Sequence, residues 1–151
     1  IITSMIMTGP MVEQQNVIAN DFLTVMDIAP TLYEIAKINY PPEFNGNSLF
    51  PLKGKSILPF ISGKAKAIHS NDYVFGLEHS GNTMLRKGQW KITNFSDPFS
   101  LSEFELYNLN DDLGEMHDLK STNPQKYQEL FQEWTNFASE IQVQLPGINY
   151  D

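Results

Sequence analysis

The sequence predicts a mixed α/β chain, and by itself an α+β arrangement. A strand and a helix of a larger α/β domain precede a small four-stranded antiparallel sheet packed against a long helix. Apolar residues recur at three- and four-residue spacing between Val25 and Ala36, as in an amphipathic helix. From residue 72 onward, short segments of β character are separated by turns, and one long amphipathic segment follows. Together these patterns favour a sheet that is covered by a helix.

The chain begins with an apolar segment. Residues 1–8 predict a β-strand that ends at Gly9-Pro10. No initiator Met and no basic segment precede this strand. A signal peptide would require such a basic segment. We therefore expect the chain to be a fragment of a longer protein.

The first predicted helix has one apolar face, made of Val25, Ile28, Ala29, Leu32, Ile35 and Ala36. Pro30 fits the first turn if Asp27 is the N-cap. Alternatively, a capping box from Thr24 to Asp27 begins the helix and places a kink at Pro30. Pro41-Pro42 prevents the helix from continuing.

The middle of the chain predicts loops. Residues 40–54 are rich in Pro and Gly, residues 57–62 predict a short helical turn, and residues 64–71 have a linker-like composition. We therefore predict two parts. Residues 1–66 form the end of an α/β domain, and residues 67–151 form a sheet-and-helix subdomain.

Four strands are predicted in the second part, over residues 73–78, 83–87, 89–94 and 103–109, with a tight turn at Lys87-Gly88. The last strand is expected to be a half-buried sheet edge. Asn123-Pro124 is a good helix opening, with Asn as N-cap and Pro at the first position. The following helix has an apolar stripe formed by Tyr127, Leu130, Phe131, Trp134, Phe137, Ala138 and Ile141. Trp90 and Trp134 are therefore expected in the core.

Composition excludes several functions. The chain has 151 residues, enough for one ordinary domain, and a net charge of −8. Nucleic-acid binding needs clustered Lys and Arg, so this charge argues against it and against an anionic membrane surface. No apolar run approaches the roughly 18 residues of a membrane span. The absence of cysteine excludes disulfides and thiolate metal sites.

Several local patterns imitate functional sites. Ser96-Asp97-Pro98 is interpreted as an ordinary turn, and Asn108, Asn110 and Asp112 match only the start of an EF-hand loop. His69, His79 and His117 show no metal-ligand spacing, which favours surface or structural roles. Asn94-Phe95-Ser96 fits the glycosylation pattern, which is common by chance. From this chain alone, no catalytic residue and no metal ligand are predicted.

The segment at 105–119, Glu-Leu-Tyr-Asn-Leu-Asn-Asp-Asp-Leu-Gly-Glu-Met-His-Asp-Leu, carries a resemblance. It is similar to the C-terminal signature of the sulfatases (arylsulfatases), which belong to the alkaline-phosphatase-like superfamily. Three further motifs occur in the order found in that family. They are Asp-Ile-Ala-Pro-Thr-Leu at 27–32, Gly-Asn-Ser-Leu at 46–49 and Arg-Lys-Gly-Gln-Trp-Lys at 86–91. Each motif alone is weak, and the four in sequence are a specific match.

The resemblance implies that this chain is the C-terminal part of an arylsulfatase-like sulfuric-ester hydrolase. It would complete the fold, pack on a missing N-terminal catalytic domain and border the pocket for an organic sulfate ester. In such enzymes a formylglycine, made from Cys or Ser in a Cys/Ser-x-Pro-x-Arg motif, attacks sulfur beside a divalent cation, usually Ca²⁺. This chain has no such motif, so the formylglycine and Ca²⁺ are expected in the intact enzyme and neither is expected to be bound here. The resemblance also implies a periplasmic or secreted location.

The same resemblance directs attention to His79 and Asn82. They flank Ser80-Gly81 at a predicted strand end, and loops from this part of several sulfatases border the substrate pocket. His79 and Asn82 are therefore candidate substrate-binding residues, and a plain hairpin turn is the other interpretation. Two other functions stay open. One is the C-terminal part of a phosphodiesterase or phosphonate hydrolase of the same superfamily, and the other is a binding module without an enzymatic parent.

Overall fold

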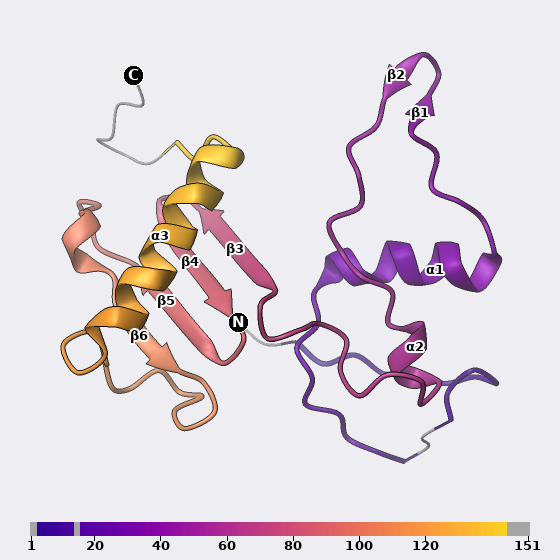
Figure 1. Ribbon diagram of the computed structural model, residues 1–151, viewed down its shortest axis with the longest axis horizontal. Coiled ribbons are helices and arrows are strands. Elements are labelled where there is room, and N and C mark those ends of the chain that lie inside the picture. Colours follow the sequence, from indigo (N-terminus) through magenta and orange to yellow (C-terminus); the bar gives the residue numbers. More distant parts are fainter. Residues whose placement is uncertain (1–2, 14–15, 145–151) are drawn as a thin grey trace. The chain divides into compact units, whose positions relative to one another are not determined.

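The computed structural model describes residues 3–13 and 16–144 and divides the chain into two compact units (Figure 1). The N-terminal unit covers residues 1–70, and the C-terminal unit covers residues 71–151. Elements of the N-terminal unit are η1 (Val25–Asp27), α1 (Ile28–Ala36), β1 (Glu43–Phe44), β2 (Asn47–Ser48) and α2 (Leu58–Ile61). Elements of the C-terminal unit are β3 (Val74–His79), β4 (Asn82–Lys87), β5 (Trp90–Asn94), η2 (Leu101–Glu103), β6 (Glu105–Asn108) and α3 (Pro124–Glu140). The assignment of residues 1–66 to a catalytic domain stays a prediction.

The C-terminal unit is the predicted sheet covered by a helix. Its four strands are antiparallel in the order β3-β4-β5-β6, and α3 lies across one face (Figure 1). This confirms the predicted fold class. The strand ends differ by one or two residues from the prediction. Lys87 pairs with Trp90, so the turn residues between β4 and β5 are Gly88 and Gln89.

The core of this unit lies between α3 and the sheet. Leu85, Ile92 and Leu106 from three strands meet Leu130 and Trp134 from the helix. All five side chains are buried, which confirms Trp134 as a core residue. Because protein interiors are close-packed, a volume change of even one methylene would be felt among these side chains.

Two other aromatic side chains, Trp90 and Phe137, also pack against this core. Trp90 is partly buried and packs against the cluster. Gly76 on β3 leaves room for Phe137 of α3, because a Cβ added at residue 76 would lie 2.6 Å from the Phe137 ring. The apolar stripe of the helix is therefore in contact with the sheet, as predicted, except near its end, where Ile141 is exposed.

The edge strand β6 differs from the half-buried strand that was predicted. Leu106, Tyr107 and Asn108 are all buried, although they alternate between the two faces. The chain after β6 returns to this edge, where the Leu119 amide donates to the Leu106 carbonyl at 2.8 Å. The strand is also shorter than predicted, since residues 101–103 form η2. The following segment thus covers an edge that would otherwise be open to pairing.

The helix α3 begins at Pro124, as predicted, but its cap differs. The Asn123 side chain accepts no hydrogen bond from the first turn, and its Nδ2 donates to Thr122 Oγ1 at 3.1 Å. The missing N–H of Pro124 is no loss at this position, because first-turn amides have no partner within the helix.

The start of α1 combines the two predicted alternatives. A capping box joins Thr24 and Asp27 around η1, and Asp27 then occupies the N-cap position of α1. Pro30 lies in the first turn, where its missing N–H is tolerated. Lys37 ends the helix in the left-handed conformation, with φ of 57°.

Two predictions for the N-terminal unit are wrong. Residues 3–8 form no strand, and Ile1 and Ile2 lie outside the described residues. An apolar extended segment becomes a strand only where a sheet edge is available to pair with it. Residues 40–54 were predicted as loop only, but β1 and β2 pair antiparallel around Asn45 and Gly46, which both have positive φ. These two-residue strands are too short to show a periodicity.

Within the described part of the chain, none of the helices has the length and apolar character needed to cross a bilayer.

Candidate functional site

The two candidate substrate-binding residues lie opposite each other at the tip of the β3–β4 hairpin. His79 and Asn82 are register partners, and paired residues project from the same face of a sheet. Ser80 and Gly81 connect them with φ of 54° and 83°, the backbone of a tight two-residue hairpin. The Glu78 carboxylate accepts the Gly81 amide at 2.8 Å. The turn therefore holds its shape without using either candidate side chain.

His79 and Asn82 point away from α3. Trp134 Nε1 of α3 donates to Thr83 Oγ1 at 2.8 Å, so Thr83 faces the helix. Successive side chains of a strand alternate between faces, which places Asn82 and its partner His79 on the opposite face. Both residues are exposed. The structure thus brings the two predicted residues together on an accessible surface, and whether they bind substrate stays a prediction.

A shallow cavity of about 570 Å³ lies elsewhere in the C-terminal unit. It opens beside Trp90 at the start of α3 and is lined by Trp90, Thr122, Asn123, Pro124, Gln125, Lys126 and Glu129. Trp90 pairs with Lys87 at the far end of β4 from Asn82. The cavity therefore includes neither candidate residue. Lys126 beside it is paired with Glu129, at 2.5 Å, so its charge is compensated.

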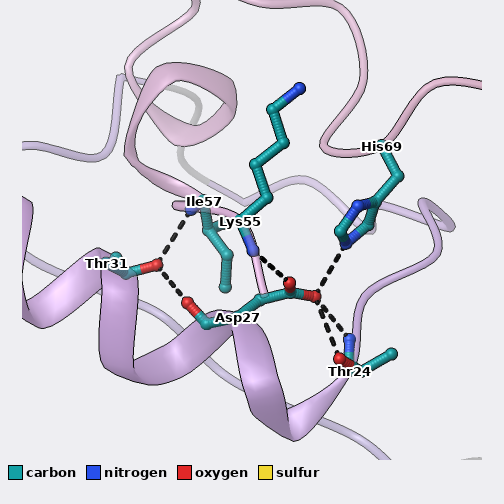
Figure 2. A network of polar contacts seen from close by, with 6 residues as sticks. All are labelled: Thr24, Asp27, Thr31, Lys55, Ile57 and His69. Carbon is teal, nitrogen blue, oxygen red and sulfur yellow. Dashed lines mark hydrogen bonds and ion pairs between the residues drawn. The ribbon is translucent and has the colours of Figure 1, made fainter. Parts of the chain in front are cut away.

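The most extensive buried polar arrangement is in the N-terminal unit, around Asp27 (Figure 2). We call it the Asp27 network, and its members are Thr24, Asp27, Thr31, Lys55, Ile57 and His69. Asp27 Oδ2 lies 2.7 Å from the Thr24 amide and 2.9 Å from His69 Nε2. Asp27 Oδ1 accepts the Lys55 amide at 2.7 Å. The carboxylate thus joins three segments that are far apart in the sequence.

Thr31 extends the network by one turn of α1. Its Oγ1 donates to the Asp27 carbonyl at 2.6 Å and accepts the Ile57 amide at 2.9 Å. Close approach of these segments also requires Gly54, because a Cβ there would lie 2.0 Å from the Met26 carbonyl oxygen. The Asp and Thr of the Asp-x-x-Pro-Thr motif, together with Gly54, therefore fix the loop at 54–57 against α1.

Burial and hydrogen bonding act in opposite directions on the Asp27 carboxyl. Desolvation raises its pKa, whereas the hydrogen bonds from His69, the Lys55 amide and the Thr24 amide lower it, and the net pKa is below the ordinary value of 3.8. Asp27 is therefore ionised at neutral pH although its side chain is fully buried. Each donor around it faces a full negative charge, which strengthens these hydrogen bonds.

The lowered pKa of Asp27 predicts how the N-terminal unit responds to acid. A carboxyl whose pKa is lower in the folded state contributes stability above its unfolded pKa of 3.8 and loses it as pH falls through the folded pKa. We expect Asp27→Asn to destabilise the unit at pH 7 and to matter progressively less below pH 3.8. Amide hydrogen exchange of α1 in both proteins at several pH values measures this. A difference in the protection of α1 between the two proteins that stays constant down to pH 2 would contradict this prediction.

The His69–Asp27 contact resembles the Asp–His half of a hydrolytic triad, in which the carboxylate orients the imidazole. The side chains of His69 and Asp27 are 5% and 0% exposed, and the His69 ring also contacts Phe22 at 6.1 Å between centroids. A catalytic base must reach the proton that it removes. The buried imidazole is therefore in a position to hold the fold rather than to meet a substrate, in agreement with the structural role predicted for it.

The polar side chains of the sulfatase-like signature at 105–119 bind backbone amides and a neighbouring strand. Asp118 Oδ1 accepts the amides of Leu106 and Lys120 at 2.9 and 2.8 Å. Glu115 accepts Lys91 Nζ from β5 at 2.6 Å. These contacts fasten the loop to the sheet. The signature therefore has a structural role in this fold.

Asp112 has the same kind of role. Its Oδ2 accepts the amides of Met116 and His117 at 2.7 and 2.8 Å. Asn108 Nδ2 donates to Asp111 Oδ2 at 2.5 Å. An EF-hand loop instead directs such oxygens at one cation. The interpretation of this stretch as a structural turn agrees with these contacts.

The possible glycosylation site is also part of the fold. Asn94 is 1% exposed, and its Nδ2 donates to the Ser100 carbonyl at 2.7 Å. Its Oδ1 accepts the amide and the hydroxyl of Ser96. A glycan is bulky and needs a surface position. A glycan on Asn94 would therefore not fit the folded C-terminal unit.

The described residues do not fit the metal and nucleophile that the sulfatase resemblance implies. Over residues 3–13 and 16–144, no three His, Cys, Asp or Glu side chains are grouped so that they could hold a metal ion. The chain also lacks the cysteine from which formylglycine is often made. We therefore assign no reaction step to this segment.

Comparison with known proteins supports the class that the motifs indicated. The family model described as N-sulphoglucosamine sulphohydrolase, C-terminal, matches residues 1–144. An uncharacterized sulfatase of Schizosaccharomyces pombe is 32% identical over 136 residues, which cover 89% of this chain and 24% of the relative. Arylsulfatase K of Rattus norvegicus is 29% identical over 80% of this chain and 21% of the relative.

Solved structures agree at the level of the fold. A 2-O GAG sulfatase matches with a TM-score of 0.63 at 21% identity. The match covers 95% of this chain and 31% of the sulfatase chain. A second protein, solved in complex with its substrate D-glucosamine-2-N,6-O-disulfate, matches with a TM-score of 0.54 at 19% identity. This match covers 77% of the present chain and 24% of the other protein's chain. These neighbours share their fold with this chain. With the family match, the chain belongs to the sulfatase family and corresponds to its C-terminal region. It spans about a quarter of the length of the curated relatives.

Proposed function

We propose that this chain is the C-terminal part of a sulfatase that hydrolyses an organic sulfate ester, and that it is catalytically incomplete by itself. The match of the C-terminal family model over residues 1–144 is the observation that carries this proposal. The nucleophile, the metal ligands and the groups that bind the sulfate would then lie in the remaining part of the intact enzyme. The present chain would complete the fold and form one wall of the substrate pocket.

The β3–β4 hairpin is the part of the wall that we assign to the substrate. His79 and Asn82 are register partners and are both exposed on the sheet face opposite α3. An imidazole and an amide can both donate hydrogen bonds, which suits sulfate and hydroxyl oxygens. A sulfated sugar is the substrate to test first, because a solved neighbour was captured with a sulfated glucosamine. The tight turn at Ser80-Gly81 would hold both donors in place before the substrate arrives.

We expect His79→Ala and Asn82→Ala in the whole gene product each to raise KM for a sulfated glucosamine at least about tenfold with kcat nearly unchanged, since one hydrogen bond to a charged group contributes about 1.5–3 kcal/mol. Steady-state kinetics measures this. His117→Ala is the matched control, because its side chain is 82% exposed on the signature loop. An unchanged KM in both hairpin variants of an active enzyme would contradict the assignment.

The same kinetic assay distinguishes a sulfatase from a phosphodiesterase or phosphonate hydrolase of the same superfamily. A sulfatase is expected to hydrolyse the sulfate ester in preference to the phosphate diester and phosphonate ester of the same alcohol. Turnover of only the phosphorus esters would identify a phosphodiesterase or phosphonate hydrolase instead.

A further inference from the structure

The cavity at the start of α3 combines one tryptophan with a polar lining. Its volume of about 570 Å³ is within the range of small-molecule sites, about 300–1,000 Å³. Trp90 is partly buried, so it packs against the core and also lines the cavity. Trp134, by contrast, is 3% exposed and contacts the rings of Phe104 and Phe131. Of the two tryptophans, Trp90 is therefore the one that a ligand can reach.

The polar groups around Trp90 suit a ligand that carries hydroxyl groups. Asn123 and Gln125 bring side-chain amides, and Thr122 brings a hydroxyl, so donors and acceptors are both present. The Asn123 side chain does not cap α3, and its Nδ2 donates to Thr122 Oγ1 at 3.1 Å. Gln125 is exposed. The Asn123 oxygen and the Gln125 amide are therefore in a position to bind a ligand in the cavity.

The charged side chains of the lining compensate each other. Lys126 Nζ lies 2.5 Å from the Glu129 carboxylate, which also lies 3.2 Å from Lys87 Nζ. Hydrogen bonds from Lys126 and Lys87 lower the pKa of the Glu129 carboxyl, so this group is ionised at neutral pH. The lining thus holds one positive and one negative charge, and no net charge attracts an anion. A neutral ligand fits this cavity better than a sulfate ester does.

We propose that this cavity is an auxiliary site for a neutral sugar ring, on which a partly sulfated polysaccharide is held. A sugar ring has an apolar C–H face that can lie against the Trp90 ring, and its hydroxyls can bind Asn123 and Gln125. This inference rests on the proposed function, because it takes its sugar from the sulfated substrate. It deepens that function, because it makes the substrate a polymer with unsulfated rings.

The cavity is separate from the β3–β4 hairpin. Trp90 pairs with Lys87, which lies five residues along β4 from Asn82, or about 17 Å at about 3.4 Å per residue. Residues of α3 line the cavity, whereas His79 and Asn82 are on the sheet face opposite α3. A polysaccharide bound at the cavity would keep its sulfated rings at a raised local concentration near the enzyme.

Binding of the neutral disaccharide of N-acetylglucosamine to the 151-residue chain tests the site directly. The chain has two tryptophans, so two indole N–H signals are expected in its nuclear magnetic resonance spectrum, and Trp90→Phe assigns them. Titration should move the Trp90 signal saturably. The Trp134 signal should stay in place, because Trp134 is buried and bonded to Thr83. A Trp90 signal that does not move, or equal movement of both signals, would overturn the proposal.

One pair of variants on α3 locates the binding. Gln125→Ala should raise the Kd of the disaccharide about three- to tenfold, the effect of one neutral hydrogen bond. Gln128→Ala is the matched control, since Gln128 is an exposed residue of the same helix outside the cavity lining, and it should leave the Kd unchanged. Equal Kd values for the two variants would overturn the site. The 6-O-sulfated disaccharide should bind no more tightly, and tighter binding of it would overturn the preference for a neutral ring.

Kinetics of the whole gene product tests the role of the site. Gln125→Ala should raise KM for a partly sulfated polysaccharide and leave KM for a sulfated glucosamine unchanged, because only the polymer loses a second contact. An unchanged KM for the polymer would overturn the auxiliary role. The indole signals need no turnover, so the proposed function fails separately. Disaccharide binding at Trp90, in a protein that hydrolyses no sulfate ester, would overturn the sulfatase activity and support the sugar site.

Discussion

Trp134→Ala is expected to lower the free energy of unfolding of the C-terminal unit by about 3–5 kcal/mol, as large-to-alanine changes in a packed core do. Trp134 is 3% exposed, and its ring lies 4.6 Å from that of Phe104 and 5.9 Å from that of Phe131. Its Nε1 also donates to Thr83 Oγ1 at 2.8 Å. The substitution therefore opens a cavity and leaves a buried hydroxyl without this donor.

Chemical denaturation followed by far-ultraviolet circular dichroism measures the loss. Phe95→Ala is the matched control, because Phe95 is 62% exposed and should cost less than about 1 kcal/mol. A loss below about 1 kcal/mol for Trp134→Ala would contradict the assignment of Trp134 to the core.

The second large effect is expected at Asp27. Asp27→Ala removes the acceptor of the Thr24 and Lys55 amides and of His69 Nε2. Removing one partner of a buried charged contact costs about 3–5 kcal/mol, because the other groups stay buried without a partner. The N-terminal unit has little apolar core to compensate. We therefore expect the amides of Lys55 and of α1 to lose most of their protection.

Hydrogen exchange at neutral pH measures this loss residue by residue. Asp72→Ala, at an exposed position in the other unit, is the control and should leave α1 protection unchanged. If α1 and Lys55 exchanged equally slowly in Asp27→Ala and in wild type, the Asp27 network would not hold the unit together. The C-terminal unit should be unaffected in either case, because it has its own core.

Local patterns were sufficient to predict the C-terminal unit. Strand-like alternation between residues 73 and 109 and the apolar stripe of α3 depend on neighbours within a few positions, and the strands were predicted to within one or two residues at each end. The turn chemistry of Ser80-Gly81 likewise placed His79 and Asn82 on one hairpin. The pairing of the β6 edge was missed because it depends on Leu119, whose amide donates to the Leu106 carbonyl from beyond the strand.

The N-terminal unit was harder to predict because its contacts are not local. The Asp27–His69 contact spans 42 positions, and no periodicity indicates it. Asp27 was recognised only as a helix start, which it also is. The apolar face of α1 was visible in the sequence, but a sequence pattern shows only that such a face exists, and not what covers it. The missing strand at residues 3–8 has the same cause, since a strand depends on a partner that local sequence does not contain.

The most direct test of the proposed sulfatase activity is the coding sequence upstream of Ile1. We expect an open reading frame that encodes a Cys/Ser-x-Pro-x-Arg motif together with clustered Asp and Asn residues, because this chain covers only about a quarter of its relatives. A start codon close to Ile1 would contradict the proposed function. No catalytic part would then accompany this chain, and a binding module without an enzymatic parent would be the better description.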